Sequence, residues 1–304
     1  MYKFYGASVK TSVVLIVLFT KLCGLTECRR VKRVVNGNEV RCGTEPRVGS
    51  LHRRDTQEHL CGAVVLSRNF AITAAHCVHL SEDNYVLQLN NYCIRDGETR
   101  PIAKITQIIT NDLYDSGNHS LTFLLSTHFI RKIGTCLRDS NNRASKAHDI
   151  ALLRITLDLN DANSEWLNES VLPSSSFGVS GECTIYGYGY KDVNTMKTSD
   201  VLSSGEVIII SLDECTQKLG PFVAPQPDSG MMCAIGYGVD ACQGDSGSPL
   251  ICEGLIQGIS SYGMSCGVSN LPGIYTSIGA HLDFIQNAIQ TQNQIKTNAS
   301  ANIE

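Results

Sequence analysis

The segment Gly244-Asp245-Ser246-Gly247 has the composition of a turn that presents a reactive serine. The small residues around Ser246, with Cys242 nearby, favour a stiff turn whose backbone N–H groups point outward. A serine hydroxyl barely ionises near neutral pH, so it needs a base to take its proton and donors to hold the developing oxyanion. The sequence therefore predicts a nucleophile at Ser246 and requires a base elsewhere in the chain.

The candidate base is His76, in Ala74-Ala75-His76-Cys77, and the candidate carboxylate is Asp149, in His148-Asp149-Ile150. These motifs and the serine motif occur in the order His, Asp, Ser. On these residues the chain resembles the trypsin-like (chymotrypsin-fold) serine proteases, from about Val34 to about Ile289. The resemblance implies that His76 is the general base, that Asp149 fixes its tautomer, and that Ser246 attacks the peptide carbonyl. It also implies an oxyanion hole made of the Gly244 and Ser246 N–H groups.

The segment Val34-Val35-Asn36-Gly37 is similar to the Ile-Val-Gly-Gly start of the activated enzymes of this family. It follows the basic cluster Arg29–Arg33, whose bland interpretation is a solvated charged patch. By resemblance, cleavage after Arg33 frees the amino group of Val34, which folds inward to pair with Asp245. The Arg-x-Lys-Arg form of the cluster is also similar to furin-type convertase sites. Activation inside the secretory pathway and activation by a trypsin-like enzyme outside it both stay open.

The substrate pocket is also inferred from the resemblance. Asp240 matches the pocket floor that pairs with Arg or Lys, and Gly263 and Gly273 match its two walls. Ala241 lacks the hydroxyl that helps to solvate a lysine ammonium, which favours Arg, since its planar fork binds a carboxylate in bidentate fashion. The remaining matched positions are the strand residues Ser261 and Tyr262, which would pair with the substrate backbone, Gln243 at the rim, and Lys146 near the subsites beyond the cleaved residue.

Thirteen cysteines point to an oxidising compartment. The resemblance implies four disulfides: Cys61–Cys77, Cys183–Cys252, Cys215–Cys233 and Cys242–Cys266. Four further cysteines allow three pairings: Cys28, Cys42, Cys93 and Cys136. We expect Cys28 to keep the short N-terminal peptide attached to the protease domain, as a light chain, after cleavage. No CxxC pair or His/Cys cluster has metal-ligand spacing, so neither a metal nor a cofactor is expected.

The N-terminus has the pattern of a secretory signal. Lys3 and Lys10 precede an apolar run over 13–19, which is too short to cross a bilayer unaided. Cleavage near Thr26 is expected, with a signal anchor as the alternative. Residues 1–33 hold seven of the 25 basic and one of the 29 acidic residues, so the rest of the chain has 18 basic and 28 acidic residues, a net charge of −10. This acidic balance favours basic substrates and argues against nucleic acid.

Three departures from the family pattern are visible. His76 and Asp149 are 73 positions apart because of extra residues within 111–144, which either restrict access to the site or form a harmless surface loop. Ser248 replaces a Gly after the nucleophile, and Asn36 replaces a Gly at the activation start. Possible glycosylation sequons begin at Asn118, Asn168 and Asn298.

The expected fold class is all-β, with two six-stranded antiparallel β-barrels and a short C-terminal helix. Short strands such as 205–210 and 255–261 fit the barrels, and apolar spacing over 279–290 fits the helix. The predicted domains are a signal peptide (1–26), an activation propeptide (27–33), the protease domain (34–290) and a polar tail (291–304).

The sequence thus predicts a secreted, extracellular, zymogen-activated serine endopeptidase that cuts after Arg, then Lys. Its expected partners are protein or peptide substrates, an activating protease and protein inhibitors of proteases, with neither nucleic acid nor membrane. A different class is a catalytically silent binding protein of the same fold, although such proteins usually lose a triad residue. A digestive role and limited proteolysis in a cascade, venom or saliva stay open.

Overall fold

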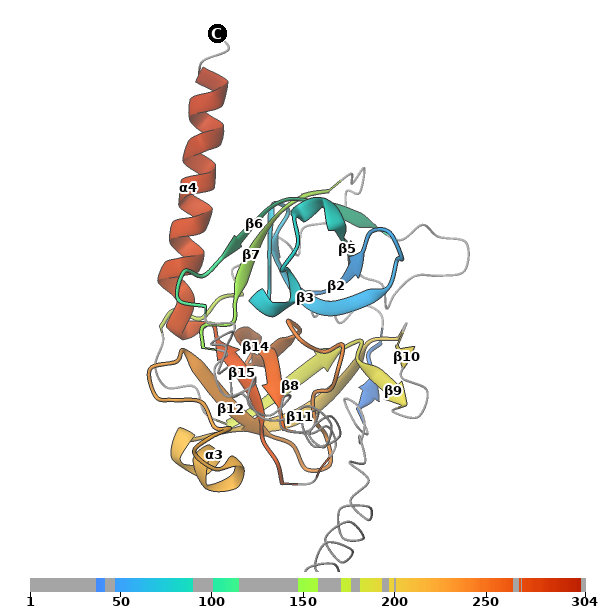
Figure 1. Cartoon of the computed structure of the whole chain (residues 1–304), viewed down its shortest axis with the longest axis vertical. Helices are drawn as coiled ribbons and strands as arrows, with labels where there is room; N and C mark the ends of the chain where they lie inside the picture. The colour runs from blue at the N-terminus through green and yellow to red at the C-terminus, as the bar shows by residue number, and fades with distance from the viewer. Residues whose placement is uncertain are drawn as a thin grey trace, which may run out of the picture. The chain divides into compact units, whose positions relative to one another are not determined.

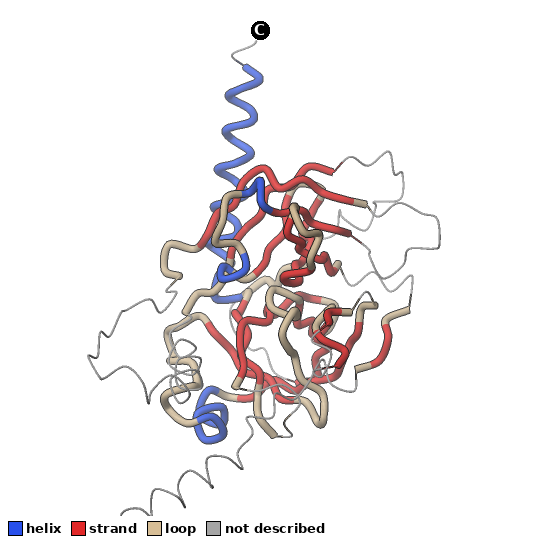
Figure 2. The backbone as a smooth tube through the Cα atoms, turned by 45° about the vertical axis from the view of Figure 1, so that its right-hand side comes forward, coloured by secondary structure: helices blue, strands red, loops and turns tan. Residues whose placement is uncertain are grey.

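The structure is a computed structural model. It describes residues 37–41, 47–89, 101–114, 147–157, 171–175, 181–192, 197–199, 201–264, 268 and 270–301. Contacts divide the chain into two units, Met1–Val31 and Lys32–Glu304, and every described residue lies in the second. Strands dominate the described elements (Figure 2). Within these residues no helix combines the length and apolar character needed to span a bilayer.

The first six long strands form a closed antiparallel barrel in the order β2-β3-β4-β7-β6-β5 (Figure 1). We call this the first barrel. Its bounds are β2 Val48–Arg53, β3 His59–Ser67, β4 Phe70–Thr73, β5 Tyr85–Leu89, β6 Ile102–Thr110 and β7 Ala151–Leu157. Two short 3-10 helices, Ala75–Cys77 and Glu82–Asn84, lie between β4 and β5.

The second barrel is closed because β8 pairs with both β11 and β13, which gives the ring β8-β11-β12-β15-β14-β13. Strand β1 adds to β11 outside this ring, and β9 and β10 form a separate pair. The bounds are β1 Asn38–Glu39, β8 Gly181–Gly187, β9 Tyr190–Asp192, β10 Lys197–Thr198, β11 Ser203–Ile210, β12 Met231–Ile235, β13 Pro249–Cys252, β14 Leu255–Gly263 and β15 Gly273–Ser277. The expected pair of six-stranded barrels is therefore confirmed.

The two-residue period of the strands sends alternate side chains to two different cores. In β3, Ala63 and Val65 face the interior of the first barrel, whereas Val64 and Leu66 face a second apolar cluster. All four side chains are buried, because both faces of the strand are covered. The second cluster lies where the first barrel meets β14 and the C-terminal helix, and we call it the shared core.

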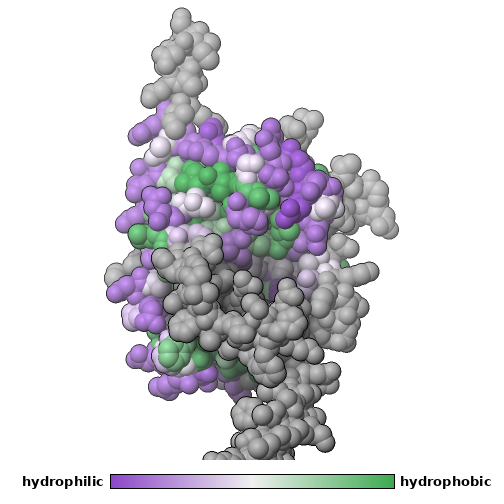
Figure 3. All heavy atoms as spheres, in the orientation of Figure 1, coloured by the Kyte–Doolittle hydropathy of each residue, from purple (hydrophilic) through white to green (hydrophobic). Residues whose placement is uncertain are grey.

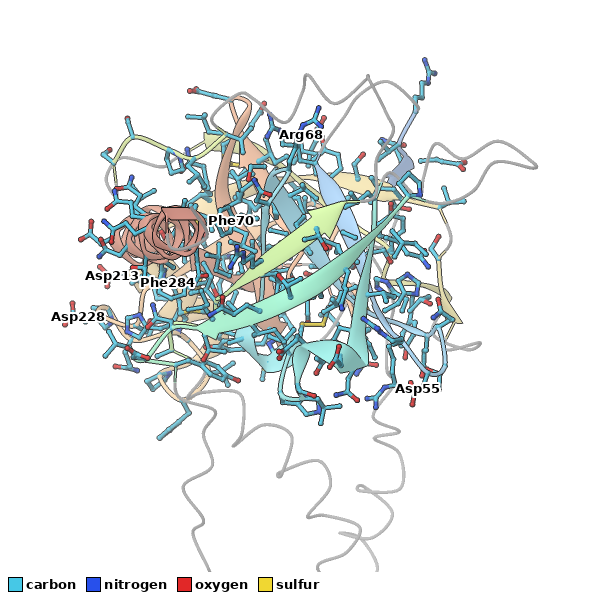
Figure 4. The ribbon with its side chains drawn as sticks, turned by 90° about the horizontal axis from the view of Figure 1, so that it is seen from above. Asp55, Arg68, Phe70, Asp213, Asp228 and Phe284 are labelled. Atoms are coloured by element: carbon cyan, nitrogen blue, oxygen red, sulfur yellow. A yellow bond between two sulfur atoms is a disulfide. The ribbon has the colours of Figure 1, made fainter. Side chains whose placement is uncertain are left out.

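The shared core holds the start of β7 in place. Ile150 and Leu152 pack there with Ile256 and Ile259 of β14 and with Ile285 of the C-terminal helix. Phe70 of the first barrel and Phe284 of the C-terminal helix belong to the same cluster, and both are labelled in the view from above (Figure 4). Because Asp149 immediately precedes Ile150, this packing fixes the position of the candidate carboxylate.

The C-terminal helix begins near the expected residue and ends later. A 3-10 turn, Gly279–His281, leads into α4, Leu282–Ala301. The helix therefore continues past its expected end near residue 290 into the segment predicted as a polar tail. Two causes are evident: no Gly or Pro interrupts 291–301, and the buried Gln292 accepts a hydrogen bond from Arg154 of β7 at 3.1 Å.

A second helix, α3 (Leu212–Leu219), connects β11 to β12. It begins at Ser211, whose side chain accepts a hydrogen bond from the Glu214 N–H, as an N-cap does. On the face seen in Figure 3, hydrophobic residues gather over the first barrel, and the described part of α4 is mostly hydrophilic.

Ile285 tests the shared core. Replacing Ile285 with Ala removes a fully buried side chain and should lower the free energy of unfolding by about 2–5 kcal/mol. Gln286→Ala, at the exposed neighbouring position, is the matched control and should change stability by less than about 0.5 kcal/mol. Urea unfolding of both variants measures the difference. Equal effects would show that α4 does not contribute to the core.

Candidate active site

His76 and Asp149 are joined by two hydrogen bonds. The backbone N–H of His76 donates to Asp149 Oδ1 at 2.9 Å, and His76 Nδ1 lies 2.6 Å from Asp149 Oδ2. An ionised carboxylate only accepts, so Nδ1 carries the proton and Nε2 is left as the basic nitrogen. The Asp149 side chain is completely buried and that of His76 is partly exposed. Burial by itself would raise the pKa of Asp149, but the charge of His76 and the hydrogen bonds from His76 and Ser261 lower it.

The second barrel supplies two further donors to Asp149. Ser261 Oγ donates to Oδ2 at 2.5 Å, and Thr276 Oγ1 donates to the backbone oxygen at 2.8 Å. Ser261 lies where the register between β14 and β15 shifts, between Ser260 and Tyr262. Such a bulge re-aims a side chain, and here it turns Ser261 toward the carboxylate. Sequence reasoning assigned Ser261 a substrate-binding role and missed this contact.

The turn that carries Ser246 lies against β3 and the end of β4. The Ser246 carbonyl accepts a hydrogen bond from Gly62 N at 2.7 Å, and Gly247 N donates to Ser260 O at 2.7 Å. Gly247 has φ +79°, and a Cβ there would collide with Thr73 Oγ1 and the Gly62 carbonyl. Only glycine fits this close approach. No hydrogen bond between Ser246 Oγ and His76 is seen among the described residues, and such contacts often tighten only when substrate binds.

The candidate oxyanion donors are the N–H groups of Gly244 and Ser246. Each is oriented by the carbonyl of the preceding residue, which belongs to the same peptide unit. In a trans peptide the C=O and N–H point in opposite directions. Tyr190 N holds the Gln243 carbonyl at 3.1 Å, and Ser248 N holds the Asp245 carbonyl at 2.9 Å. The N–H groups of Gly244 and Ser246 therefore point away from these contacts. This orientation is compatible with the expected role of the two N–H groups as oxyanion donors.

The Gly244 carbonyl is itself held by a histidine that the sequence analysis missed. His59 Nε2 lies 2.8 Å from this oxygen and therefore donates to it. Ser50 Oγ lies 2.7 Å from both His59 Nδ1 and His52 Nε2, and these two histidines face each other in the β2–β3 register. The sequence held a signal of a buried role for these histidines, since both occur in strongly apolar strands. The register of the two strands, which brings the rings together, could not be predicted from one sequence.

Asp245 is fully buried and bound by backbone donors. Gly189 N donates to Oδ1 at 2.6 Å and Cys242 N donates to Oδ2 at 2.8 Å. A Cβ at Gly187 or Gly189 would collide with the carboxylate, so both positions require glycine. The proposed partner of Asp245, Val34, and the cleavage residue Arg33 lie outside the described residues.

The predicted pocket residues lie at the ends of β14 and β15. Gly263 and Gly273 are directly opposite each other in the antiparallel pair, and a Cβ at Gly263 would meet open space. Asp240 is buried. Burial raises the pKa of Tyr275 well above its usual value, and the charges of Asp240 and Asp245 raise it further, so both carboxylates act on this one phenol. Ala241 and Tyr262 are half-buried, and Gln243 is exposed. Burial raises the pKa of Tyr262, and the charge of Asp149 raises it further.

Ser248 is a buried departure from the family motif. Its hydroxyl has no hydrogen-bond partner among the described residues, and a Cβ at Gly62 would collide with it. The space for this hydroxyl therefore depends on glycine at position 62.

Three of the four expected disulfides are present: Cys61–Cys77, Cys183–Cys252 and Cys215–Cys233. Cys242 is also disulfide-bonded, and its expected partner, Cys266, lies outside the described residues. Several other predicted features also lie there: Lys146, the cysteines 28, 42, 93 and 136, the sequons at 118 and 168, and most of the 111–144 segment. The Cys61–Cys77 bond adjoins His76, whose ring nitrogen lies within 4.8 Å of both sulfurs.

Comparison with known proteins identifies the family. Residues 34–285 match the family model of Trypsin. The chain belongs to the trypsin family. This trypsin-family chain is thus a serine endopeptidase, and its histidine, aspartate and serine motifs lie within the matched residues.

Two curated relatives and one solved structure illustrate the similarity. Kallikrein-8 of Homo sapiens is 30% identical, over 84% of this chain and 86% of its own length. Coagulation factor XI of Bos taurus is 28% identical, over 83% of this chain but only 37% of its own length. The solved structure is neuropsin, a serine protease expressed in the limbic system of mouse brain, with a TM-score of 0.63 and 27% identity, covering 84% of this chain and 99% of that chain.

The Ser261 bond predicts a pH-dependent loss of stability. A carboxyl with a lowered pKa contributes stability that is full above its unfolded pKa, near 3.8, and is lost as the pH falls through its folded pKa. Ser261→Ala raises the pKa of Asp149 and should cost about 1.5–3 kcal/mol at pH 7 and less at pH 2.5. The control, Thr276→Val, removes a bond to an uncharged oxygen, so its cost should not vary with pH. Urea unfolding at both pH values distinguishes the two, and a Ser261→Ala effect of constant size would contradict the assignment.

Proposed function

We propose that this protease hydrolyses peptide bonds through Ser246, His76 and Asp149. The observation that carries the proposal is the pair of hydrogen bonds between His76 and the buried Asp149, which leaves His76 Nε2 as the basic nitrogen. Asp149 would fix this tautomer and stabilise the imidazolium that forms during the reaction.

In the proposed reaction, Ser246 Oγ attacks the substrate carbonyl carbon while its proton passes to His76 Nε2. The oxyanion accepts hydrogen bonds from the N–H groups of Gly244 and Ser246, each worth about a hundredfold or more in rate. His76 then gives its proton to the leaving amine, and an acyl-enzyme remains on Ser246. Water attacks the ester with His76 again as base, which releases the carboxylic acid and restores the serine.

We further propose that the substrate residue before the cleaved bond is Arg, then Lys. The buried carboxylate of Asp240 supplies the charge, and the opposed glycines 263 and 273 leave room for a long side chain. Ala241 provides no hydroxyl for an ammonium, whereas a guanidinium can bind a carboxylate through two parallel hydrogen bonds. Gln243, Tyr262 and the backbone of Ser261 are proposed substrate contacts.

We propose that the chain is made as a secreted zymogen. A signal peptide over 1–26 and a propeptide over 27–33 would precede the protease domain, and cleavage after Arg33 would free Val34. The new amino group would pair with Asp245, whose carboxylate already receives two backbone hydrogen bonds. Such a buried pair suits a switch better than a source of stability. Its partners would be protein substrates, an activating protease and protease inhibitors.

Active-site labelling tests the triad and its activation together. A fluorophosphonate should label the chain at Ser246 only after cleavage following Arg33, because the oxyanion donors and the base must both be in place. Ser246→Ala should take up no label after cleavage, and Arg33→Gln should take up none after the same protease treatment. Label on Ser246→Ala, or a cleaved wild-type chain that takes up none, would contradict the proposed function.

Matched peptide substrates test the pocket. With Arg or Lys as the only difference, kcat/KM should be higher for Arg, by roughly threefold to tenfold, because of the bidentate contact. Asp240→Asn should lower kcat/KM for both substrates by about a hundredfold or more, since it removes the charge that pairs with them. Its labelling by the fluorophosphonate should change little. Equal or better cleavage after Lys would refute the preference for Arg.

A further inference from the structure

A pair of histidines lies directly behind the candidate carboxylate. His148, which precedes Asp149, places its Nδ1 3.0 Å from Nε2 of His281, in the 3-10 turn that leads into α4. The rings meet edge to face, with centroids 5.2 Å apart and an interplanar angle of 75°. His281 is buried and His148 is half-buried. The contact therefore joins the turn of Asp149 to the start of the C-terminal helix.

The backbone around the pair is arranged to bring the two rings together. Ser229 O accepts a hydrogen bond from His148 N at 2.9 Å, and Gly230 O accepts one from Ser277 N at 2.9 Å. Gly230 has φ +69°, and a Cβ there would lie 2.5 Å from His281 Cε1 and 2.9 Å from His148 Nδ1. Only glycine at 230 leaves room for both rings.

The direction of the hydrogen bond follows from the partner of His281. Its Nδ1 lies 2.6 Å from the Ser277 carbonyl, which can only accept, so Nδ1 carries a proton. In the neutral ring, Nε2 then has a lone pair, and His148 Nδ1 must donate to it. The neutral pair therefore has one defined arrangement, with hydrogen bonds running from His148 to His281 to Ser277.

The same segment shapes the backbone of Asp149. His148 has φ +52°, a conformation that is uncommon for residues other than Gly, Asn, Asp and His. Its carbonyl accepts a hydrogen bond from Ile150 N at 2.8 Å, which closes a three-residue turn centred on Asp149. We propose that His148 and His281 are positioning residues: their contact holds this turn, and it opens when both rings are protonated. The proposal rests on the proposed catalytic role of Asp149.

The hydrogen bond between His148 and His281 survives the uptake of one proton and is lost on uptake of the second. A proton on Nε2 of His148 leaves its Nδ1–H bonded to His281 and strengthens the bond by adding charge. A proton on Nε2 of His281 as well would place two N–H groups against each other and two charges side by side. Burial lowers the pKa of both histidines, and the charge of His148 lowers that of His281 further, against the raising effect of the Ser277 carbonyl. The contact is therefore intact at neutral pH and is lost only in acid.

Other titratable groups occur on the elements next to the pair. Asp149 is bonded to His76 and Ser261, and the charge of His76 acts on Asp149. Asp228, before Ser229, and Asp283, in the first turn of α4, are both exposed. Second protonation of the pair thus adds to the loss of the general base in acid, since a base must be neutral to accept a proton.

A pH series of fluorophosphonate labelling tests the proposal. The rate at which the activated chain takes up the label is measured from pH 8 to pH 4, and this reagent does not depend on binding in the Asp240 pocket. Protonation of a single general base makes the logarithm of the rate fall with a slope of one in acid. Wild type should become steeper than one in acid, where the pair opens. His148→Asn keeps a donor in place of Nδ1 and tolerates φ +52°, so its rate at neutral pH should be within about threefold of wild type. Its amide can turn its oxygen toward His281 when Nε2 of that ring takes up a proton, so the contact survives and the slope should stay at one.

Two further variants separate positioning from general damage. His148→Gly tolerates the backbone conformation but removes the donor, so its rate should fall roughly tenfold to a hundredfold at every pH, since small displacements of a catalytic group are costly. His79→Asn, at an exposed histidine, is the control and should match wild type throughout. Near-ultraviolet circular dichroism at each pH restricts the comparison to folded protein.

The outcomes are distinct. A wild-type slope of one throughout, or the same steepening in His148→Asn as in wild type, would overturn the role of the pair. Failure of activated wild type to label at any pH would instead refute the proposed function. Nitrogen NMR of wild type supplies a second measurement: His281 should carry its proton on Nδ1 at neutral pH, and the opposite tautomer would overturn the proposal even if a variant fails to fold.

Discussion

The buried negative charge of Asp149 is the constraint on which the rest of the site depends. A carboxylate withdrawn from water is stable only if donors replace its hydration. The first barrel provides two through His76, and the second barrel provides one through the hydroxyl of Ser261. Neither barrel alone satisfies this charge, so the site exists only where the two meet. The shared core beneath it, from Ile150 to Ile285, supplies the apolar contact that keeps them together.

Three buried carboxylates serve the site in different ways. Asp149 receives hydrogen bonds from a side chain that gains charge during the proposed reaction, and Asp245 receives uncharged backbone donors from Gly189 and Cys242. The charges of Asp240 and Asp245 both act on Tyr275. Such a concentration of negative charge favours cations. The proposed cations are the arginine of the substrate and the amino group of Val34, which would make selection of substrate and activation depend on the same kind of force.

The motifs around His76, Asp149 and Ser246 carried a resemblance to a known family, and that resemblance was enough to predict the two barrels and to propose these three residues. What could not be predicted depends on strand register. Ser261 reaches Asp149 only because a bulge shifts its strand by one position, and His59 reaches the Gly244 carbonyl only because of how β3 approaches the serine turn. Contacts between residues more than a hundred positions apart leave no local pattern, as the pair of His148 and His281 illustrates. The end of α4 was misjudged for a related reason, since Arg154 reaches Gln292 from another element.

Any side chain at position 62 would collide with Ser248, and this has a consequence for how the chain can evolve. A methyl group at 62 needs the space that the hydroxyl of 248 now fills. Each residue therefore sets the allowed size of the other, although they are far apart in the sequence. A larger residue at 62 can be accommodated only after the residue at 248 has become smaller. The order in which the two mutations arise therefore matters. The serine that distinguishes this chain from its family pattern thus closes some mutational routes and leaves others open.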